Sequence, residues 1–425
     1  MLPLTGRSEN TRFTAFFKLA TYVLTAFYFV NCLTHLQLHY DTLRYYAIKD
    51  CWEYGCPPDS DSAHDYLPYG YTGLLLLLSK LHILRSFSIV FINALYLLGG
   101  LYFTRKMFGT AIRPFVFFVV VMLNWAVIKF YAYPLSELQY LFFSIGSLYF
   151  YFQYTKNKRP LPLVLAFVFA GLAFLTRTIG IALVPALLLS LIWEYRKELT
   201  RIVRNNKILV VIAGLVVIGV VVFSKQLGLD HYTGVMSKQK QGGVNFAQIL
   251  EWRFKEWAEL FFNVPSNKVL NYLPAKAGTE FFVLAGILFF AWFVYLFISR
   301  KTSIPVIVRI YLLFYGVIMF SWPFYDPRFW VPVIPLLSAI LLQTPVDKSK
   351  AIKGFGSLYL GVYMLLGVAA LSFATYLCFN KKEFARHHAN GVYRNEYETH
   401  FFGKPLSDTA TQVNPFDLHV LDRYD

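Results

Sequence analysis

The chain has 425 residues, of which 57% are hydrophobic, 19% are aromatic and only 15% are charged, and its formal net charge is +16. A soluble domain rarely has this balance, whereas a polytopic membrane protein usually does. No segment resembles a Gly-rich phosphate loop between a strand and a helix, which argues against an enzyme that uses a soluble nucleotide-linked substrate.

Hydrophobic run length predicts an all-α polytopic membrane protein with about eleven spans, because a bilayer-spanning helix needs about 20 mostly apolar residues. The clearest run is KILVVIAGLVVIGVVVFS, residues 207–224. The stretch 67–83 is shorter, and we expect a helix there that lies at the outer surface or is partly re-entrant. In chain order the expected spans are 13–35, 86–104, 112–130, 134–154, 161–176, 179–195, 207–224, 280–299, 304–323, 329–345 and 355–379.

Lys and Arg in short loops indicate the orientation, because cytoplasmic loops carry an excess of them. With a cytoplasmic N-terminus, every short inner loop is basic, as at Arg105 and Lys106 or at Lys156, Lys158 and Arg159. The positive charge is then mostly a topology signal, and nucleic-acid binding is not expected. We therefore expect a multi-pass integral membrane protein with an extracytoplasmic C-terminus. Its compact loops favour a bacterial cytoplasmic membrane.

The spans define one transmembrane domain over residues 1–379, with polar extracytoplasmic loops at 36–66 and 225–279 and an extracytoplasmic tail at 380–425. In the second loop, EWRFKEWAELFF (251–262) has apolar residues at helical spacing, which predicts an amphipathic helix at the membrane interface. In the first loop, Cys51 and Cys56 flank WEYG. They form a disulfide if the loop faces an oxidising compartment, or they are two free thiols, and the sequence leaves both open.

Five ionisable residues lie at the ends of expected spans, where such residues are costly and mark candidate functional sites. Each also has a structural interpretation: a turn for Asp326, snorkelling for Arg177 and a helix cap for Glu137. The topology nevertheless places all five at the extracytoplasmic edge, which favours a shared site. They are Asp41, Glu137, Arg177, Asp326 and Arg328.

This combination of side chains indicates group transfer at a membrane surface. A carboxylate acts as a general base on a hydroxyl or amine nucleophile. Arginines hold a phosphate and stabilise it as a leaving group. A site at the interface suits a substrate with a polar head and a lipid tail. The sequence therefore predicts transfer from a lipid phosphate to an acceptor outside the cytoplasm.

Four motifs, one of them a pair of segments, occur in the order of a known pattern. HYDTLRYYAIKD resembles a first-loop motif in which an acid precedes an aromatic residue and Ala, and DYLPYGYTGLLLLLSKL resembles the segment that closes that loop. YPLSELQYLFFSIGSLYFYF and GLAFLTRTIGIALVPALLL resemble paired P-x-S-E and T-R-x-x-G-(5)-P segments, and DPRFWVPVIPLL resembles a late R-Y/F-x-x-P-x-x-P segment. The chain thus resembles the GT-C superfamily of membrane glycosyltransferases, near both the bacterial enzymes related to protein O-mannosyltransferases and the PIG-V-like mannosyltransferases. These enzymes use polyprenyl- or dolichyl-phosphate sugars.

The resemblance implies a role for each charged residue. Asp41 would be the general base that takes the proton from the acceptor hydroxyl, with inversion at the anomeric carbon. Arg328 first, and Arg177 second, would hold the lipid phosphate. Glu137 and Asp326 would orient the sugar, the acceptor or the arginines.

Further residues are implied to contact the substrate. Tyr69, Tyr71 and Trp330 would line the sugar or lipid groove, with an interfacial aromatic belt as the alternative. His64 precedes DYLPYGY, where relatives often show H-P-P-L-x-Y. The chain departs from the family there and at Thr42, which follows the first-loop acid where many relatives have a second acid. These departures leave open which residues contact the acceptor and whether a divalent metal joins the site.

A transporter or flippase for a lipid-linked or anionic substrate is the main alternative. Transporters place charged residues near the bilayer midplane, often within repeats, whereas here the charges gather at one face and no repeat is evident. A scaffold subunit of a membrane complex is a third interpretation. The expected partners are the lipid-linked sugar, membrane lipids and an acceptor glycan, lipid or protein. The sugar stays open, with mannose or another hexose as candidates.

Overall fold

The computed structural model describes residues 7–196, 229–270, 272, 274–343, 350–406 and 412–425. All regular secondary structure in these residues is helical, and no strand occurs among them. Within the described residues, four segments are long and apolar enough to cross a membrane, and they include most of α1, α4, α15 and α18: Thr11–Leu33, Ser86–Ala111, Lys276–Ile298 and Gly356–Cys378. The chain is therefore a helical protein with membrane-protein character.

The finer expectation of about eleven spans is not confirmed. Several expected spans are shorter apolar helices, such as α8 (Pro160–Thr176), α9 (Leu183–Glu194) and α16 (Val306–Ser321). The expected span 207–224 lies outside the described residues. The stretch 67–83 does contain a helix, α3 (Tyr69–Lys80).

The expected span 112–130 is divided into α5 (Pro114–Met122) and α6 (Trp125–Phe130). Asn124 stands at the break. Its side-chain oxygen caps α6 by accepting from the Ala126 N–H at 3.1 Å, and its Nδ2 donates to the carbonyl oxygen of Leu260 at 2.9 Å. A polar residue that caps one helix and binds another explains why a continuous apolar run does not form one helix.

The expected span 329–345 is also divided. It begins as the 3₁₀ helix η4 (Pro327–Val333), which continues into α17 (Ile334–Leu341). Pro332 lies inside η4 and lacks a backbone donor, so a regular α-helix is disfavoured there. In the expected span 134–154, the helix α7 (Glu137–Asn157) begins only after a buried turn at residues 131–136.

The core of the molecule surrounds α7, which packs against α4 (Ser86–Phe108), α8 and η4. Beside it, α13 (Phe246–Phe262) packs closely on α15 (Ala275–Ile298). Gly286 makes this approach possible, because a Cβ at that position would overlap the carbonyl oxygen of Phe254. Small residues allow such close contact between helix backbones.

The expected amphipathic helix 251–262 is present as part of α13, and its face that carries Arg253, Glu256 and Trp257 is buried rather than exposed. The reason is that α13 packs against α15, α16 and η4, so polar groups on its inner face are paired within the molecule.

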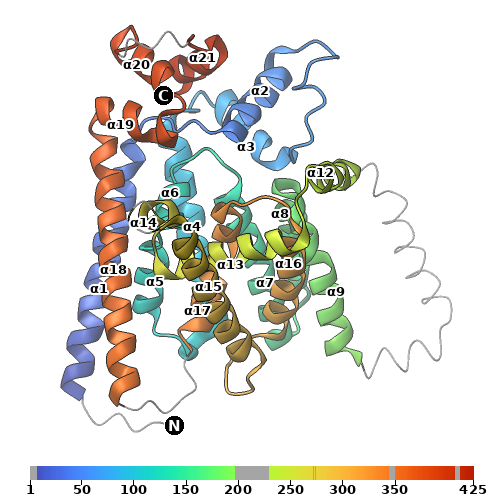
Figure 1. Ribbon diagram of the computed structural model, residues 1–425. Helices are drawn as coiled ribbons and strands as arrows, with labels where there is room; N and C mark the ends of the chain where they lie inside the picture. Colours follow the sequence, from blue (N-terminus) through green and yellow to red (C-terminus); the bar gives the residue numbers. More distant parts are fainter. Residues whose placement is uncertain (1–6, 197–228, 271, 273, 344–349, 407–411) are drawn as a thin grey trace, which may run out of the picture.

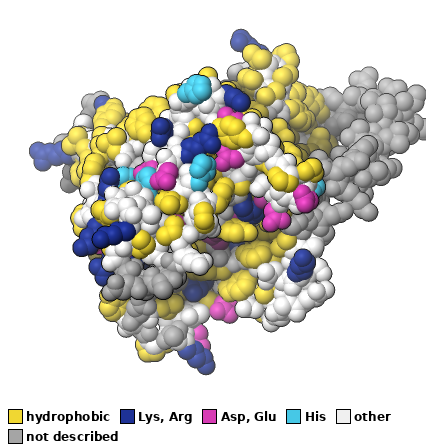
Figure 2. Space-filling model, turned by 90° about the horizontal axis from the view of Figure 1, so that it is seen from above, with side chains coloured by type: hydrophobic (Ala, Val, Ile, Leu, Met, Phe, Trp, Pro, Cys, Tyr) yellow, Lys and Arg dark blue, Asp and Glu magenta, His cyan; other side chains and the backbone are white. Residues whose placement is uncertain are grey.

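A layer of helices covers one end of the molecule, shown at the top of Figure 1, opposite the end where α1 (Arg7–Val30) begins. Seen from above in Figure 2, Lys, Arg, Asp, Glu and His side chains lie on this face among hydrophobic ones. The layer consists of α2 (Tyr40–Tyr54), α3, α19 (Lys381–His387), α20 (Arg394–Phe402) and α21 (Pro415–Tyr424). The other elements are η1 (Asn31–Leu33), η2 (Gly109–Ala111), η3 (Thr178–Ala182), α12 (Leu229–Gln241), α14 (Ser266–Leu270), α18 (Lys350–Cys378) and η5 (His388–Gly391).

The tail from residue 380 packs onto the segment that leads into α2. The hydroxyl of Tyr397 accepts from the Leu38 N–H at 2.8 Å and donates to the Leu36 carbonyl oxygen at 2.7 Å. At the other end of α2, Cys51 and Cys56 form a disulfide with their Cα atoms 4.8 Å apart, which resolves the alternative left by the sequence. The first loop is thus held at both ends of its helix.

Candidate functional site

Asp41 lies in the first turn of α2, where the helix begins after an extended segment. His39 caps this helix, and its Nδ1 accepts a hydrogen bond from the Asp41 N–H at 3.2 Å. A carboxylate in the first turn is favoured by the positive end of the helix dipole. The side chain of Asp41 is 19% exposed, so water reaches it.

Glu137 lies in the first turn of α7 and is 1% exposed. It forms an ion pair with Arg177, which follows α8. The preceding Ser136 accepts hydrogen bonds from Arg177 Nη1 at 3.3 Å and from the Tyr45 hydroxyl at 3.0 Å. These contacts join the starts of α2 and α7 to the end of α8.

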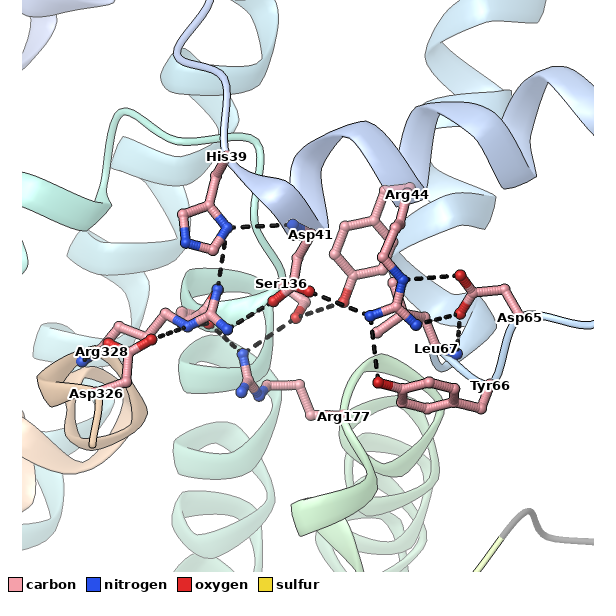
Figure 3. A network of polar contacts seen from close by, with 12 residues as sticks. His39, Asp41, Arg44, Asp65, Tyr66, Leu67, Ser136, Arg177, Asp326 and Arg328 are labelled. Carbon is pink, nitrogen blue, oxygen red and sulfur yellow. Dashed lines mark hydrogen bonds and ion pairs between the residues drawn. The ribbon is translucent and has the colours of Figure 1, made fainter. Parts of the chain in front are cut away.

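Figure 3 shows Arg328 joined to His39, Asp41 and Asp326 in the charged network. Its Nη2 lies 2.6 Å from Asp41 Oδ2, and its Nε lies 2.8 Å from Asp326 Oδ2 and 3.6 Å from Glu137 Oε1. Asp326 also caps η4 by accepting from the Arg328 N–H at 3.0 Å. One guanidinium therefore connects three carboxylates from three separate parts of the chain.

The charges keep Asp41 ionised. Burial raises the pKa of Asp41, but the Arg328 guanidinium, together with Arg44, outweighs burial and holds that pKa below its ordinary value. Burial lowers the pKa of His39, and the nearby Arg328 lowers it further. His39 is then neutral at pH 7, so its Nδ1 can accept both from Asp41 and from Arg328 Nη1, 3.4 Å away.

A second arginine supports Asp41 from the solvent side. Arg44 Nη1 lies 3.3 Å from Asp41 Oδ1, and the same guanidinium binds Asp65 at 2.7 and 2.9 Å. The Tyr66 hydroxyl accepts from Arg44 at 3.3 Å. These bonds attach the chain before α3 to the first turn of α2.

A separate Arg–Glu pair lies next to the network. Arg253 Nη1 and Glu256 Oε2 are 2.9 Å apart, and both side chains are 0% exposed. Glu256 accepts from the Asp326 N–H at 2.8 Å and from Trp330 Nε1 at 2.7 Å. Burial raises the pKa of Glu256 to about 8. Through Glu256, the pair therefore holds the segment 326–330, which carries Arg328, against α13.

The five charged residues predicted from sequence are brought together, but two other predicted site residues are not. His64 is exposed on the loop before α3, because its neighbour Asp65 turns inward to Arg44. Tyr69 is exposed at the start of α3, with its ring 5.2 Å from that of Trp52. Neither has a contact with the network among the described residues.

The other two aromatic residues predicted to line a groove are buried. Tyr71 packs its ring 4.9 Å from that of Tyr45, and its hydroxyl has no partner among the described residues. Trp330 is 3% exposed and is held by Glu256. Both are therefore packing residues next to the network in this structure.

Several residues of the network were not predicted from sequence. His39 and Arg44 stand beside Asp41 in the first-loop motif, and Ser136 stands beside Glu137, so adjacency was an available signal. Arg253 and Glu256 are three residues apart, which places them on one face of a helix. Their contact with the segment around Asp326, about seventy residues later, cannot be predicted from a single sequence.

No described residues form a ready coordination set for a metal, since no three His, Cys, Asp or Glu side chains among them are grouped so as to hold an ion. Among the described residues, two surface depressions occur: one of about 280 Å³ beside the disulfide and α21, and one of about 750 Å³ between α13 and α15. Neither is lined by a residue of the charged network. The network is instead reached through the partly exposed side chains of Asp41, Arg177 and Asp326.

No protein-family model, no curated protein and no solved structure matches the chain. Function is therefore argued from the geometry of the site and from the resemblance of the four sequence motifs.

Proposed function

We propose that the chain is an integral membrane glycosyltransferase that moves a sugar, mannose or another hexose, from a polyprenyl-phosphate carrier to an acceptor on the extracytoplasmic side. One observation carries the proposal. A partly exposed, ionised carboxylate, Asp41, lies 2.6 Å from Arg328, in a layer at the end of the molecule opposite the start of α1. The charged network thus combines a base for the acceptor hydroxyl with cations for a phosphate.

In the proposed reaction, Asp41 accepts the proton of the acceptor hydroxyl while that oxygen attacks the anomeric carbon. The bond between the anomeric carbon and the phosphate oxygen breaks, the phosphate keeps the electron pair, and the configuration inverts. Arg328 and Arg177 stabilise the charge that develops on the phosphate. Because the leaving group is a phosphate, no general acid is required.

The lowered pKa of Asp41 makes it a weak base while Arg328 remains bound to it. A phosphate that draws the Arg328 guanidinium away removes this partner, so donor binding increases the basicity of Asp41. The ion pair between Arg328 and Asp41 then couples donor binding to activation of the acceptor.

Glu137 serves a different role in this proposal. It is 1% exposed and has both Arg177 and Arg328 beside it. A side chain so buried orients the two arginines rather than touching the sugar.

The proposal is tested by transfer with purified protein in liposomes, using a panel of radiolabelled polyprenyl-phosphate sugars and a membrane extract as acceptor. Label that moves from one donor to any acceptor supports the enzyme and names its sugar. A folded protein that transfers from none of the donors, but moves a labelled lipid-linked sugar between the leaflets, would instead establish the flippase alternative.

A further inference from the structure

Lys129 is the one exposed residue in an otherwise buried stretch of chain. Every other residue from 121 to 141 is buried, including those on both sides of it in α6. This stretch leads directly to Ser136 and Glu137 of the network. Lys129 is therefore a single exposed position within a packed stretch, rather than part of a generally exposed helix surface.

The ammonium group of Lys129 has no ion pair with any described residue. Its Nζ lies over the ring of the adjacent Phe130, 5.0 Å from the ring centroid. By contrast, Arg177 and Arg328 each bind carboxylates of the network. Lys129 is thus an uncommitted cation on α6, which packs against η4 and so lies beside the Arg328 segment.

Lys129 interacts electrostatically with two acids, Asp326 and Glu259, and with the cations Arg328 and Lys268. Both acids are already engaged. Asp326 binds Arg328 at 2.8 Å, and Glu259 Oε1 accepts from the Ser266 N–H at 2.7 Å and from the Tyr325 hydroxyl at 2.5 Å.

The network needs an additional cation before it attracts a phosphate. Its inner carboxylates are Asp41, Glu137 and Asp326, whereas its inner cations are Arg177 and Arg328, so acids exceed cations by one. Arg44 is balanced by Asp65. A lipid phosphate that enters this network meets excess negative charge, unless Lys129 takes part.

We propose that Lys129 binds the phosphate of the carrier lipid beside Arg328, an inference that rests on the proposed function. The charge of this phosphate rises from about −1 in the sugar diester to about −2 in the released monoester. An uncommitted ammonium therefore interacts more strongly with the product than with the donor, and it stabilises the charge that develops during transfer.

The test measures binding of polyprenyl monophosphate, without sugar, to purified protein in detergent micelles. We expect Lys129→Met to weaken binding about tenfold or more, because a charge-assisted contact is lost. Lys129→Arg should retain most of the affinity. Lys268→Met is the matched control, since Lys268 is a nearby cation on α14, and it should change affinity less than about threefold.

Further arms identify the source of the phosphate. Inorganic phosphate and phosphatidic acid test a free anion and a general lipid headgroup, and polyprenol without phosphate tests the tail alone. The binding of polyprenol should not depend on Lys129. Equal effects of Lys129→Met on phosphatidic acid and on the carrier would overturn the proposal in favour of a headgroup anchor.

Unchanged carrier affinity in a folded Lys129→Met protein that still transfers sugar would overturn the role of Lys129 while leaving the proposed function intact. Absence of carrier binding to the wild type would overturn both. Thermal unfolding of each variant establishes that it is folded.

Discussion

Two arginine–carboxylate clusters share the segment 326–330, and they differ in what surrounds them. In the network, Arg328 has three carboxylate neighbours and water reaches Asp41, whose pKa is held below its ordinary value. In the pair on α13, Arg253 and Glu256 are fully buried, and burial raises the pKa of Glu256 to about 8. The same residue types thus have opposite pKa shifts, because ion partners outweigh burial in one cluster and burial outweighs them in the other.

This difference suits the Asp41 cluster to proton transfer and the Glu256 pair to a structural role. A base must exchange protons with a substrate and must therefore be reachable and ionised, as Asp41 is. Glu256 instead receives hydrogen bonds from the Asp326 N–H and from Trp330, so its oxygen atoms are occupied by the protein. The predictions below test this division.

The largest expected effect is on transfer by Asp41→Asn. This change keeps the shape and removes the base, so we expect transfer to fall by about 10²–10⁴-fold. The assay is the initial rate of sugar transfer in liposomes at saturating donor. The matched control is Asp59→Asn, an exposed acid on the loop before α3, which should keep the wild-type rate. Turnover by Asp41→Asn at the wild-type rate would end the assignment of Asp41 as the base.

The second prediction concerns the buried pair. Arg253→Met leaves the buried Glu256 carboxyl group without its guanidinium partner, and a buried polar group left unsatisfied costs about 1–3 kcal/mol of stability. Thermal unfolding in detergent should show a decrease in the midpoint temperature. The Arg253→Met, Glu256→Leu double variant should recover part of it, because no buried polar group of the pair is then left unsatisfied.

Arg309→Met is the matched control for this prediction. Arg309 is half-buried on α16, and it donates to the Ser299 carbonyl oxygen at 3.3 Å without a carboxylate partner among the described residues. Its loss should cost about 1 kcal/mol. If Arg253→Met is no less stable than Arg309→Met, the pair is not the support that we infer.

The smallest expected effect is a shift in pH dependence. Arg44 is one of the groups that lower the pKa of Asp41, so Arg44→Met should raise this pKa and move the acid limb of the rate profile to higher pH, by less than about one pH unit. Arg44→Lys keeps the charge and should show little shift. An acid limb that moves to lower pH in Arg44→Met would contradict the expected direction.

The same pKa has a consequence for stability. The folded pKa of Asp41 is lower than its unfolded value, so the ionised group stabilises the fold above the unfolded pKa. This contribution is lost as the pH falls through the lowered folded pKa. In Arg44→Met the loss should begin at a slightly higher pH.

Sequence patterns predicted the charged layer better than they predicted the helices around it. The positions of Asp41, Glu137, Arg177, Asp326 and Arg328 at the ends of apolar runs were sufficient to predict that they meet. The lengths of the apolar runs predicted the helix boundaries less well. They could not show that Asn124 divides one run, or that a buried turn delays the start of α7, because both depend on contacts with distant segments.

The burial of the Arg253 and Glu256 side chains of α13 could not be predicted from the sequence either. The alternation of charged and aromatic residues in α13 is the pattern of a surface helix, and only the packing of α15 and η4 against it buries Arg253 and Glu256. His64 and Tyr69, expected to contact the substrate, lie away from the network, because motif similarity does not specify which way a loop residue turns.

Gly286 links the candidate spanning helix α15 to the segment that carries Arg328. Because a Cβ there would overlap the Phe254 carbonyl oxygen, the backbones of α15 and α13 are in direct contact. Two residues along α13 from Phe254, Glu256 holds the Asp326 N–H. The position of the arginines relative to the candidate spanning helix is therefore set by a main-chain contact at Gly286 and by the buried side chain of Glu256. A bilayer that tilts α15 would move the segment that carries Arg328 with it.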